Sequence, residues 1–278
     1  MTILVTGARG SLGGRVLSRL AGAGHPVRGT ARDAGALDLP EGAEPAELDV
    51  TATGPWPALR GVTELFLYTV RGDAGPFLAA AREAGVRHVV LLSSPAAYDV
   101  GEFDQPIGLI HRAMERAVAD SGLPHTVVYP SWLATNARRD WGDQLRAEGR
   151  IAMAHPDAQV NPVHPDDVAE VAVALLTGTR HRARRLVVTG PASVRQRDLV
   201  EVLGKVLGKA IPVDELTREQ AIAARPPWLP EDILTTLLDV SAQAVGVPAA
   251  VTNTVERVTG HPARPFADWA RQAGFTIG

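Results

Sequence analysis

The chain has 278 residues, is 45% apolar and has a mean hydropathy of +0.01, which is typical of a globular protein with room for an α/β core and a smaller lobe. Its net charge of −3 provides no basic excess for nucleic acid or an anionic membrane, and no apolar run approaches the roughly 18 residues of a membrane span. The absence of cysteine excludes disulfides, thiolate metal sites and cysteine nucleophiles. We therefore expect a cytoplasmic protein without a signal peptide that binds neither nucleic acid nor membranes.

The first half of the chain alternates short apolar runs with stretches of helical periodicity. We predict helices over residues 12–23, 75–84 and 107–120, and strands over residues 3–5, 27–31, 47–50, 64–69, 87–93 and 125–129. Strands that alternate with helices form right-handed βαβ units and a parallel sheet. The expected fold class is α/β, a Rossmann doubly wound parallel sheet with a smaller, mostly helical C-terminal lobe.

The second half of the chain has a less regular pattern. A strand end at 161–164 precedes a predicted helix over 165–176, and 186–189 is a further short strand. Ser193-x-x-Gln196 and Thr217-x-x-Gln220 are capping-box patterns, each of which predicts the start of a helix. Most of the last third is therefore expected to be helical.

Residues 5–14 read VTGARGSLGG and place Gly7, Gly10 and Gly13 in a G-x-x-G-x-x-G loop between the first strand and the first helix. Glycine lets the backbone turn sharply and approach a pyrophosphate, and the helix start adds free N–H groups and a positive dipole. Because the loop opens a helix inside a βαβ unit, the pattern favours a dinucleotide site over a purely structural turn. Ser11 and Leu12 belong to the same helix start and are counted among the expected nucleotide-binding residues.

The end of the second strand bears on which nicotinamide dinucleotide binds. An NAD site usually has an acid there for the ribose 2′-hydroxyl, but Ala31 occupies that position and Arg32 follows it. Arg32 and Arg9, which lies in the glycine loop, suit a 2′-phosphate because guanidiniums bind phosphate bidentately. Asp33 leaves NADH open, since a one-residue shift would restore an acid. We therefore predict NADPH as the cofactor, with NADH as the alternative.

With these residues in view, the chain resembles the short-chain dehydrogenase/reductase superfamily, and most closely its NmrA-like atypical branch. The resemblance covers nearly the whole chain. It rests on an ordered series of motifs, which are TGARGSLG at 6–13, VRGTARD at 27–33, LDV at 48–50, VRHVVLLSS at 86–94, ERAVADSGLPHTVVYPSWLATN at 115–136, PVHPDDVAEVA at 162–172, LVVTGPASVRQRDL at 186–199 and TGHPARPFADWA at 259–270.

The resemblance also implies positions for the parts of the cofactor. Asp49 and Val50 would lie along the adenine, and Thr69 and Val70 would lie beside the cofactor ribose. The nicotinamide would be bordered by the next strand end, which is formed by Tyr129, Pro130 and Ser131.

Typical members of the superfamily use serine, tyrosine and lysine, and the phenol protonates the nascent alkoxide while the lysine, four residues later on a helix, lowers its pKa. Ser94 matches the serine, and if Glu115 aligns with the family's glutamate, His111 occupies the lysine position. No tyrosine in the chain has a lysine four residues later, because all lysines come after residue 204. The usual general acid is therefore absent.

Three interpretations of this absence remain open. In the first, the protein is a reductase in which Ser94 binds the substrate carbonyl, and the proton comes from water, from His111 or from a hydroxyl of the substrate. In the second, His111 only pairs with Glu115 one helical turn later, and Ser94 only caps the fifth strand. In the third, the protein is a non-catalytic NAD(P)-binding redox sensor, as some NmrA-like proteins are. Tyr129 is either a displaced acid or part of the pocket wall, and we favour the wall.

The aromatic side chains favour an enzyme that acts on a large apolar substrate over a non-catalytic protein. Trp132, Trp141 and Trp228 lie in irregular segments that the family uses to cover substrate, and tryptophan offers flat apolar surface for a polycyclic compound. Core packing is the alternative for each of them. The histidines at 155, 164 and 181 have no regular metal spacing, so no metal site is predicted.

The sequence as a whole predicts an NADPH-dependent ketoreductase that acts on a bulky apolar ketone of the aromatic polyketide type. The alternatives are a quinone oxidoreductase and the redox sensor. We expect an NADP-binding core at 1–130, a substrate-side lid at 131–160, a return to the core at 161–190 and a substrate-binding lobe at 191–278. The expected partner is a small hydrophobic substrate, and the protein would be a monomer or homodimer. Expected catalytic residues are Ser94 and His111, and expected substrate contacts are Ser131, Trp132, Trp141 and Trp228.

Overall fold

The computed structural model describes residues 2–98 and 106–278. Its internal contacts divide the chain into two compact units. Unit 1 comprises Met1–Pro130, Pro165–Val188 and Thr254–His261, and unit 2 comprises Ser131–His164, Thr189–Asn253 and Pro262–Gly278. Among the described residues, none of the helices combines the length and the apolar character that a membrane crossing requires.

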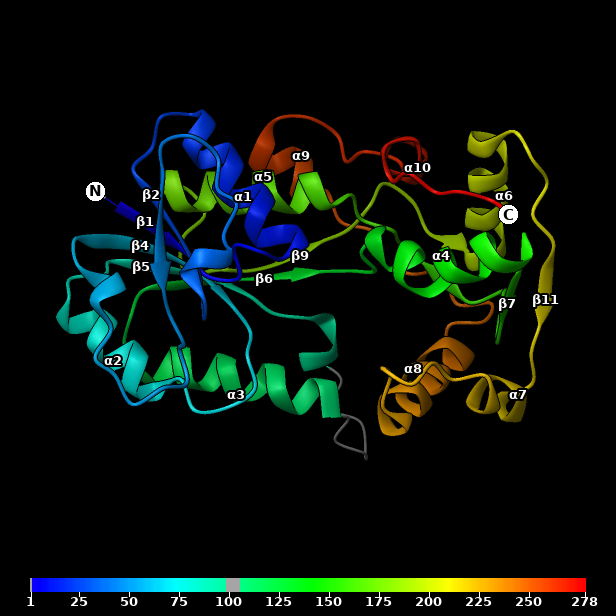
Figure 1. Ribbon diagram of the computed structural model, residues 1–278, viewed down its shortest axis with the longest axis horizontal. Coiled ribbons are helices and arrows are strands. Elements are labelled where there is room, and N and C mark those ends of the chain that lie inside the picture. Colours follow the sequence, from blue (N-terminus) through cyan, green and yellow to red (C-terminus); the bar gives the residue numbers. More distant parts are fainter. Residues whose placement is uncertain (1, 99–105) are drawn as a thin grey trace. The chain divides into compact units, whose positions relative to one another are not determined.

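Unit 1 is built on a seven-stranded parallel sheet (Figure 1), which confirms the predicted doubly wound α/β fold. The strand order is β3-β2-β1-β4-β5-β6-β9. The strands are β1 (Thr2–Val5), β2 (Val27–Ala31), β3 (Ala43–Glu47), β4 (Val62–Tyr68), β5 (His88–Leu92), β6 (His125–Pro130) and β9 (Arg185–Val188). The order reverses between β1 and β4, so the turn after β1 lies at the topological switch point, where nucleotides bind in such sheets.

Helices cover both faces of this sheet. Figure 1 shows α1 (Ser11–Gly22), α5 (Pro165–Thr177) and α9 (Thr254–Thr259) on one face, and α2 (Gly75–Glu83) and α3 (Pro106–Asp120) on the other. The two faces explain why the central strands are continuous apolar runs, since every residue of β5 is buried. The core includes Phe66 from β4 and Phe77 from α2, both fully buried.

The third strand differs from the sequence prediction of residues 47–50. It spans Ala43–Glu47, at the edge of the sheet, where a polar strand that contains Pro45 is tolerated because few backbone groups need partners. Leu48 and Val50 are apolar because they are buried beyond the strand end, not because they form the strand. A short apolar run after a polar edge strand therefore misled the periodicity argument.

Unit 2 contains five helices and two small sheets within the described chain. The helices are α4 (Thr135–Glu148), α6 (Gln196–Leu207), α7 (Arg218–Ala223), α8 (Glu231–Gln243) and α10 (Phe266–Gln272). Parallel strands β7 (Ile151–Met153) and β11 (Val213–Glu215) pair, as do antiparallel strands β8 (Gln159–Val160) and β10 (Val194–Arg195). Its core is aromatic and includes Trp141, Phe266 and Trp269.

One of the two predicted capping boxes is wrong and one is confirmed. Thr217 accepts a hydrogen bond from the backbone N–H of Gln220, whose side chain accepts one in return from the backbone N–H of Thr217 at the start of α7. Ser193 instead contacts the side chain of Gln159 and accepts from the N–H of Ala249, and α6 begins after Arg195. The short strand β10 intervenes because residues 194–195 pair with β8.

Replacing Gly13 with alanine should disrupt unit 1 at the turn after β1. An added Cβ would lie 2.2 Å from the carbonyl oxygen of Gly7, which is backbone and cannot move aside cheaply. We expect a loss of about 1–3 kcal/mol in the free energy of unfolding, measured by urea denaturation. The matched control is Gly22→Ala in the same helix, where nothing lies within 4 Å of the added Cβ and alanine should stabilise slightly. Equal stability of the two variants would contradict the close-approach argument.

Candidate functional site

The glycine loop forms a tight turn from β1 into α1. Gly7 has a φ of +66°, and the N–H of Gly10 donates to the carbonyl of Gly7 at 2.8 Å. Helix α1 begins at Ser11 with Gly10 as its N-cap, and neither a side-chain cap nor an acid in the first turn satisfies or neutralises this helix end. The backbone N–H groups at the start of α1 can therefore bind an anion, and the helix dipole favours it.

A cavity of about 180 Å³ opens at the carboxyl ends of β1, β2 and β4. It brings together six residues that the sequence assigned to the cofactor, which are Gly7, Arg9, Arg32, Asp49, Val50 and Val70. Thr69 is not among its lining residues, because the Thr69 hydroxyl is buried and donates to the carbonyl of Leu92 at 2.8 Å. The uncapped helix start and this adjoining cavity fit a nucleotide with an anionic linker.

The charged residues beside this cavity differ in whether they already have hydrogen-bonded partners. Arg9 and Arg32 are exposed, and neither guanidinium is hydrogen-bonded to a described residue. The carboxylate of Asp33 accepts from the N–H of Gly35 at 2.9 Å and caps a short 3-10 turn, so it already has a local structural role. Asp49 accepts from the N–H and hydroxyl of Thr51, and these hydrogen bonds, together with the charge of Arg32, hold its pKa below the usual range.

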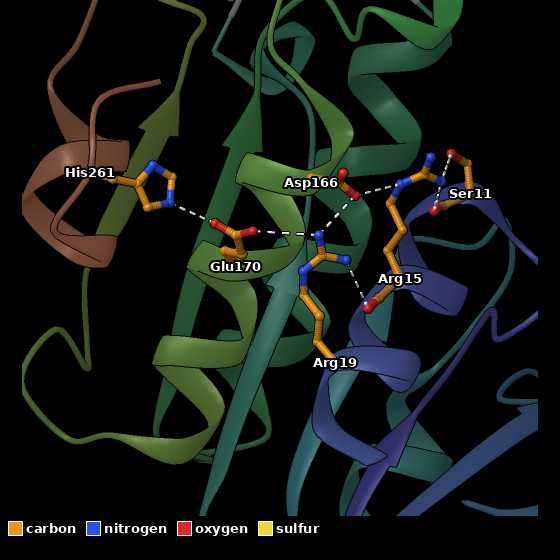
Figure 2. A network of polar contacts seen from close by, with 6 residues as sticks. All are labelled: Ser11, Arg15, Arg19, Asp166, Glu170 and His261. Carbon is orange, nitrogen blue, oxygen red and sulfur yellow. Dashed lines mark hydrogen bonds and ion pairs between the residues drawn. The ribbon is translucent and has the colours of Figure 1, made fainter. Parts of the chain in front are cut away.

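An arginine network fixes the start of α1 against α5 (Figure 2). The Arg15 guanidinium donates to the carbonyl of Ser11 at 2.9 Å, to the Ser11 hydroxyl at 3.2 Å and to Asp166 at 2.9 Å. Arg19 continues the network by contacting Asp166 at 3.0 Å and Glu170 at 3.4 Å. Because Ser11 accepts from Arg15, its hydroxyl hydrogen remains available for a ligand at the helix start.

The same network ends at a cluster that the sequence analysis did not consider. Oxygen and nitrogen atoms of Asp167, Glu170 and His261 lie within 4.8 Å of one another, although His261 is 91 residues from Glu170. Glu170 and His261 are joined at 2.6 Å, and Glu170 also contacts Arg19. Each carboxylate oxygen of Glu170 therefore already has a partner within the protein. Residues far apart in the chain gave no spacing signal that could have revealed it.

The two serines that end β5 have different partners. Ser94 is the N-cap of a 3-10 turn at Pro95–Ala97, and its hydroxyl accepts from the N–H of Ala96 at 3.3 Å. Capping uses an acceptor position and leaves the hydroxyl hydrogen free, so Ser94 can still donate to a carbonyl. Ser93, which the sequence analysis did not single out, donates to Glu115 at 2.5 Å and lies 3.4 Å from Nδ1 of His111.

The spacing of His111 and Glu115 on α3 suggested a direct pair. The structure instead connects the two side chains through the hydroxyl of Ser93. His111 is half-buried, and burial lowers the pKa of its imidazole while the charge of Glu115 opposes this effect. A neighbouring hydroxyl on the adjacent strand end is invisible to a helical-spacing argument, which is why Ser93 was missed.

Tyr129 is fully buried, and its hydroxyl donates to the second oxygen of Glu115 at 2.9 Å. Its ring lies 4.3 Å from the ring of Tyr98, centroid to centroid. Burial and the neighbouring Glu115 carboxylate raise the pKa of Tyr129 far above its usual range. A buried phenol that donates to Glu115 favours the pocket-wall interpretation of Tyr129, which stays a prediction.

The expected substrate contacts lie in unit 2. Trp141 is 3% exposed in its aromatic core, with its ring 5.9 Å from that of Trp132, so packing alone accounts for its position. Trp228 is 55% exposed and offers an uncovered ring. The Ser131 hydroxyl donates to the carbonyl of Asn161 at 2.8 Å, next to Pro130 at the end of β6. The substrate role of these residues stays a prediction.

Replacing Tyr129 with phenylalanine should destabilise the protein without changing its shape. The variant leaves one oxygen of a largely buried carboxylate without its donor, which we expect to cost about 1–3 kcal/mol in urea denaturation. Tyr68→Phe is the matched control, because that ring is 49% exposed. Similar losses in the two variants would argue against a structural role for the Tyr129–Glu115 hydrogen bond.

Comparison with known proteins places this geometry in a family. A family model described as NAD(P)H-binding matches residues 7–179, more than half of the chain. The chain is 39% identical over 286 residues to (4-alkanoyl-5-oxo-2,5-dihydrofuran-3-yl)methyl phosphate reductase from Streptomyces griseus, covering 97% of each protein. It is 30% identical over 289 residues to an NAD(P)H azoreductase from Xenophilus azovorans, covering 99% of each.

The fold has a solved counterpart in an NADPH complex. The NADPH-dependent quinone oxidoreductase of Escherichia coli superimposes with a TM-score of 0.78 at 22% identity, covering 98% of this chain and 99% of the other. At that identity the likeness concerns the fold. Together with the family model and the relatives in sequence, the site shows that the chain belongs to the NAD(P)H-binding family and is an NAD(P)H-dependent oxidoreductase, as its resemblance to the NmrA-like atypical short-chain dehydrogenases/reductases predicts.

Proposed function

We propose that the protein uses NADPH to reduce a bulky, apolar, conjugated carbonyl compound, of which an aromatic polyketide ketone is the narrower candidate. The observation that carries this proposal is the state of the phenol at the end of β6. Within this proposal Tyr129, which is buried and donates its hydrogen to Glu115, does not act as the phenolic acid at the end of β6. A substrate reduced here must tolerate the charge that develops when hydride arrives.

A conjugated substrate can tolerate the charge that hydride transfer creates. NADPH, when bound, provides the hydride. Hydride addition to a conjugated acceptor leaves a negative charge spread over several atoms, so it needs less protonation in the transition state than an isolated ketone. A phenol beside the substrate carbonyl would supply a further internal hydrogen bond. Within this proposal Ser94 donates its hydroxyl hydrogen to the carbonyl oxygen, and His111, which faces the neighbouring Ser93, is the titratable group.

The names of the relatives agree with a conjugated acceptor. The protein from Streptomyces griseus is named for an alkanoyl furanone phosphate, and the protein from Xenophilus azovorans for azo compounds. The fold neighbour from Escherichia coli is named for quinones, which keeps quinone reduction as the second candidate. The three names describe unsaturated acceptors of different kinds, which are a dihydrofuranone, an azo compound and a quinone.

The choice of NADPH over NADH rests on the charges beside the cavity. Arg9 and Arg32, which have no hydrogen bond to any residue that the structure describes, suit the two extra charges of a 2′-phosphate. Asp33, the residue that left NADH open, is engaged in capping a turn. A carboxylate held in that way has less freedom to accept from both hydroxyls of an NADH ribose.

Replacing Arg32 with alanine should raise the KM for NADPH by about 10-fold or more, because a guanidinium–phosphate contact is worth about 1.5–3 kcal/mol. The KM for NADH should stay the same, since NADH has no 2′-phosphate. Arg60→Ala removes another exposed arginine, which lies outside the cavity lining, and controls for net charge. An unchanged preference between the two cofactors in Arg32→Ala would exclude Arg32 from phosphate binding.

A panel of acceptors distinguishes the proposed reactions. NADPH oxidation should be fastest with a polycyclic ketone that has a neighbouring phenol, slower with the same ketone after methylation of that phenol, and slowest with an isolated aliphatic ketone. Quinones that outpace every ketone would favour the second candidate. Tight binding of NADPH without oxidation by any acceptor would favour a redox sensor instead.

A further inference from the structure

We infer that Ser93 and Glu115 fix the His111 imidazole with a proton on Nδ1, so that Nε2 is the nitrogen that exchanges a proton with the substrate. Ser93 and Glu115 are then positioning residues that act through His111. The first half of the inference concerns the resting protein alone, whereas the role of Nε2 rests on the proposed function.

The hydrogens available on Ser93, Glu115 and His111 determine which imidazole nitrogen carries the proton. The Ser93 hydroxyl has one hydrogen, and its oxygen lies 2.5 Å from Oε1 of Glu115 and 3.4 Å from Nδ1 of His111. An ionised carboxylate can only accept, so the shorter contact takes the serine hydrogen. The serine oxygen can then only accept from the imidazole, which requires the proton on Nδ1.

The other side of Glu115 supports its role as an acceptor. Oε2 receives the hydrogen of the buried Tyr129 phenol at 2.9 Å, so both carboxylate oxygens face donors. The nearest cation is Arg185 on β9, at 4.0 Å from Oε2. The Glu115 side chain is 12% exposed, so water contributes little to its solvation and the two hydroxyls hold it in place.

His111 therefore has one nitrogen engaged and one available. Nδ1 faces Ser93, and no described residue is hydrogen-bonded to Nε2. Burial lowers the pKa of His111, and the negative charge of Glu115, one hydroxyl away, opposes this effect only in part. This is the arrangement in which a hydrogen-bonded partner determines which ring nitrogen is free for chemistry.

The proton-transfer step balances without a further reactant. NADPH bound here would supply the hydride and be oxidised to NADP⁺, and the oxygen of the conjugated substrate would gain negative charge. The Nε2–H bond of the imidazolium breaks as an O–H bond forms on that oxygen. The product is neutral, and His111 is left as a neutral imidazole that retains its Nδ1 proton toward Ser93.

Nitrogen NMR of the full-length protein labelled at histidine tests the assignment in the resting state, without cofactor or substrate. The His111 resonances are identified by their disappearance in His111→Gln. Above the His111 pKa we expect an attached proton on Nδ1 and an unprotonated Nε2. A neutral imidazole with its proton on Nε2, or with both nitrogens averaged, would overturn the inference.

Three substitutions separate positioning from general packing. Ser93→Ala should abolish the preference for the Nδ1 proton, and Ser93→Thr should restore it because the hydroxyl is retained. Glu115→Gln should lower the pKa of His111, since a charge that favours the imidazolium is removed. Ser94→Ala is the matched control and should leave the His111 tautomer unchanged, because Ser94 caps a turn and has no hydrogen bond to His111. An unchanged tautomer in Ser93→Ala would also refute the inference.

The role of Nε2 in proton transfer is tested separately, by enzyme kinetics. Ser93→Ala should lower kcat on the acceptor that the panel identifies, with the Kd for NADPH unchanged. If the tautomer is as inferred and kcat does not fall, Nε2 has no part in proton transfer. If no acceptor oxidises NADPH while the tautomer is as inferred, the proposed function fails and the positioning by Ser93 and Glu115 stands.

Discussion

The close approach of α1 to the turn after β1 is the constraint on which the rest of unit 1 depends. At Gly13 a single added carbon would lie 2.2 Å from the carbonyl oxygen of Gly7. Because no side chain intervenes, the helix can start directly beyond the strand, and no side chain caps its first N–H groups. The sheet order places that helix start at the switch point, so one steric requirement creates both the packing of α1 and the anion site.

The region at the carboxyl ends of β5 and β6 is organised around a buried negative charge. Glu115 takes the hydrogens of Ser93 and Tyr129, and these contacts tie α3 to the ends of β5 and β6. Burial and the Glu115 carboxylate also raise the pKa of the Tyr129 phenol above its usual range. Within the proposed function, Ser94 and His111 take the place of the tyrosine–lysine pair that the sequence lacks, and the substrate itself stabilises the negative charge that hydride transfer creates.

Sequence reasoning succeeded where local chemistry alone decides the structure. The strands β2 and β5 and the helix α3 follow from apolar runs and helical periodicity, and the glycine loop follows from its place between strand and helix. It failed where a contact with a distant segment overrides local pattern. Residues 48–50 are apolar because they are buried beyond a strand end, and Ser193 caps no helix because its neighbours pair with β8.

The sequence by itself determined the fold class, the nucleotide loop, the pair of arginines beside it and the absence of the tyrosine–lysine pair. Each of these depends on residue type and short spacing, which a linear chain displays directly. Only the tertiary structure decided which of two adjacent serines meets His111, that Tyr129 is a donor to Glu115, and that Arg15 spans from Ser11 to Asp166. These contacts join residues on different strands and helices, and their hydrogen-bond directions exist only once the sheet has set the register between them.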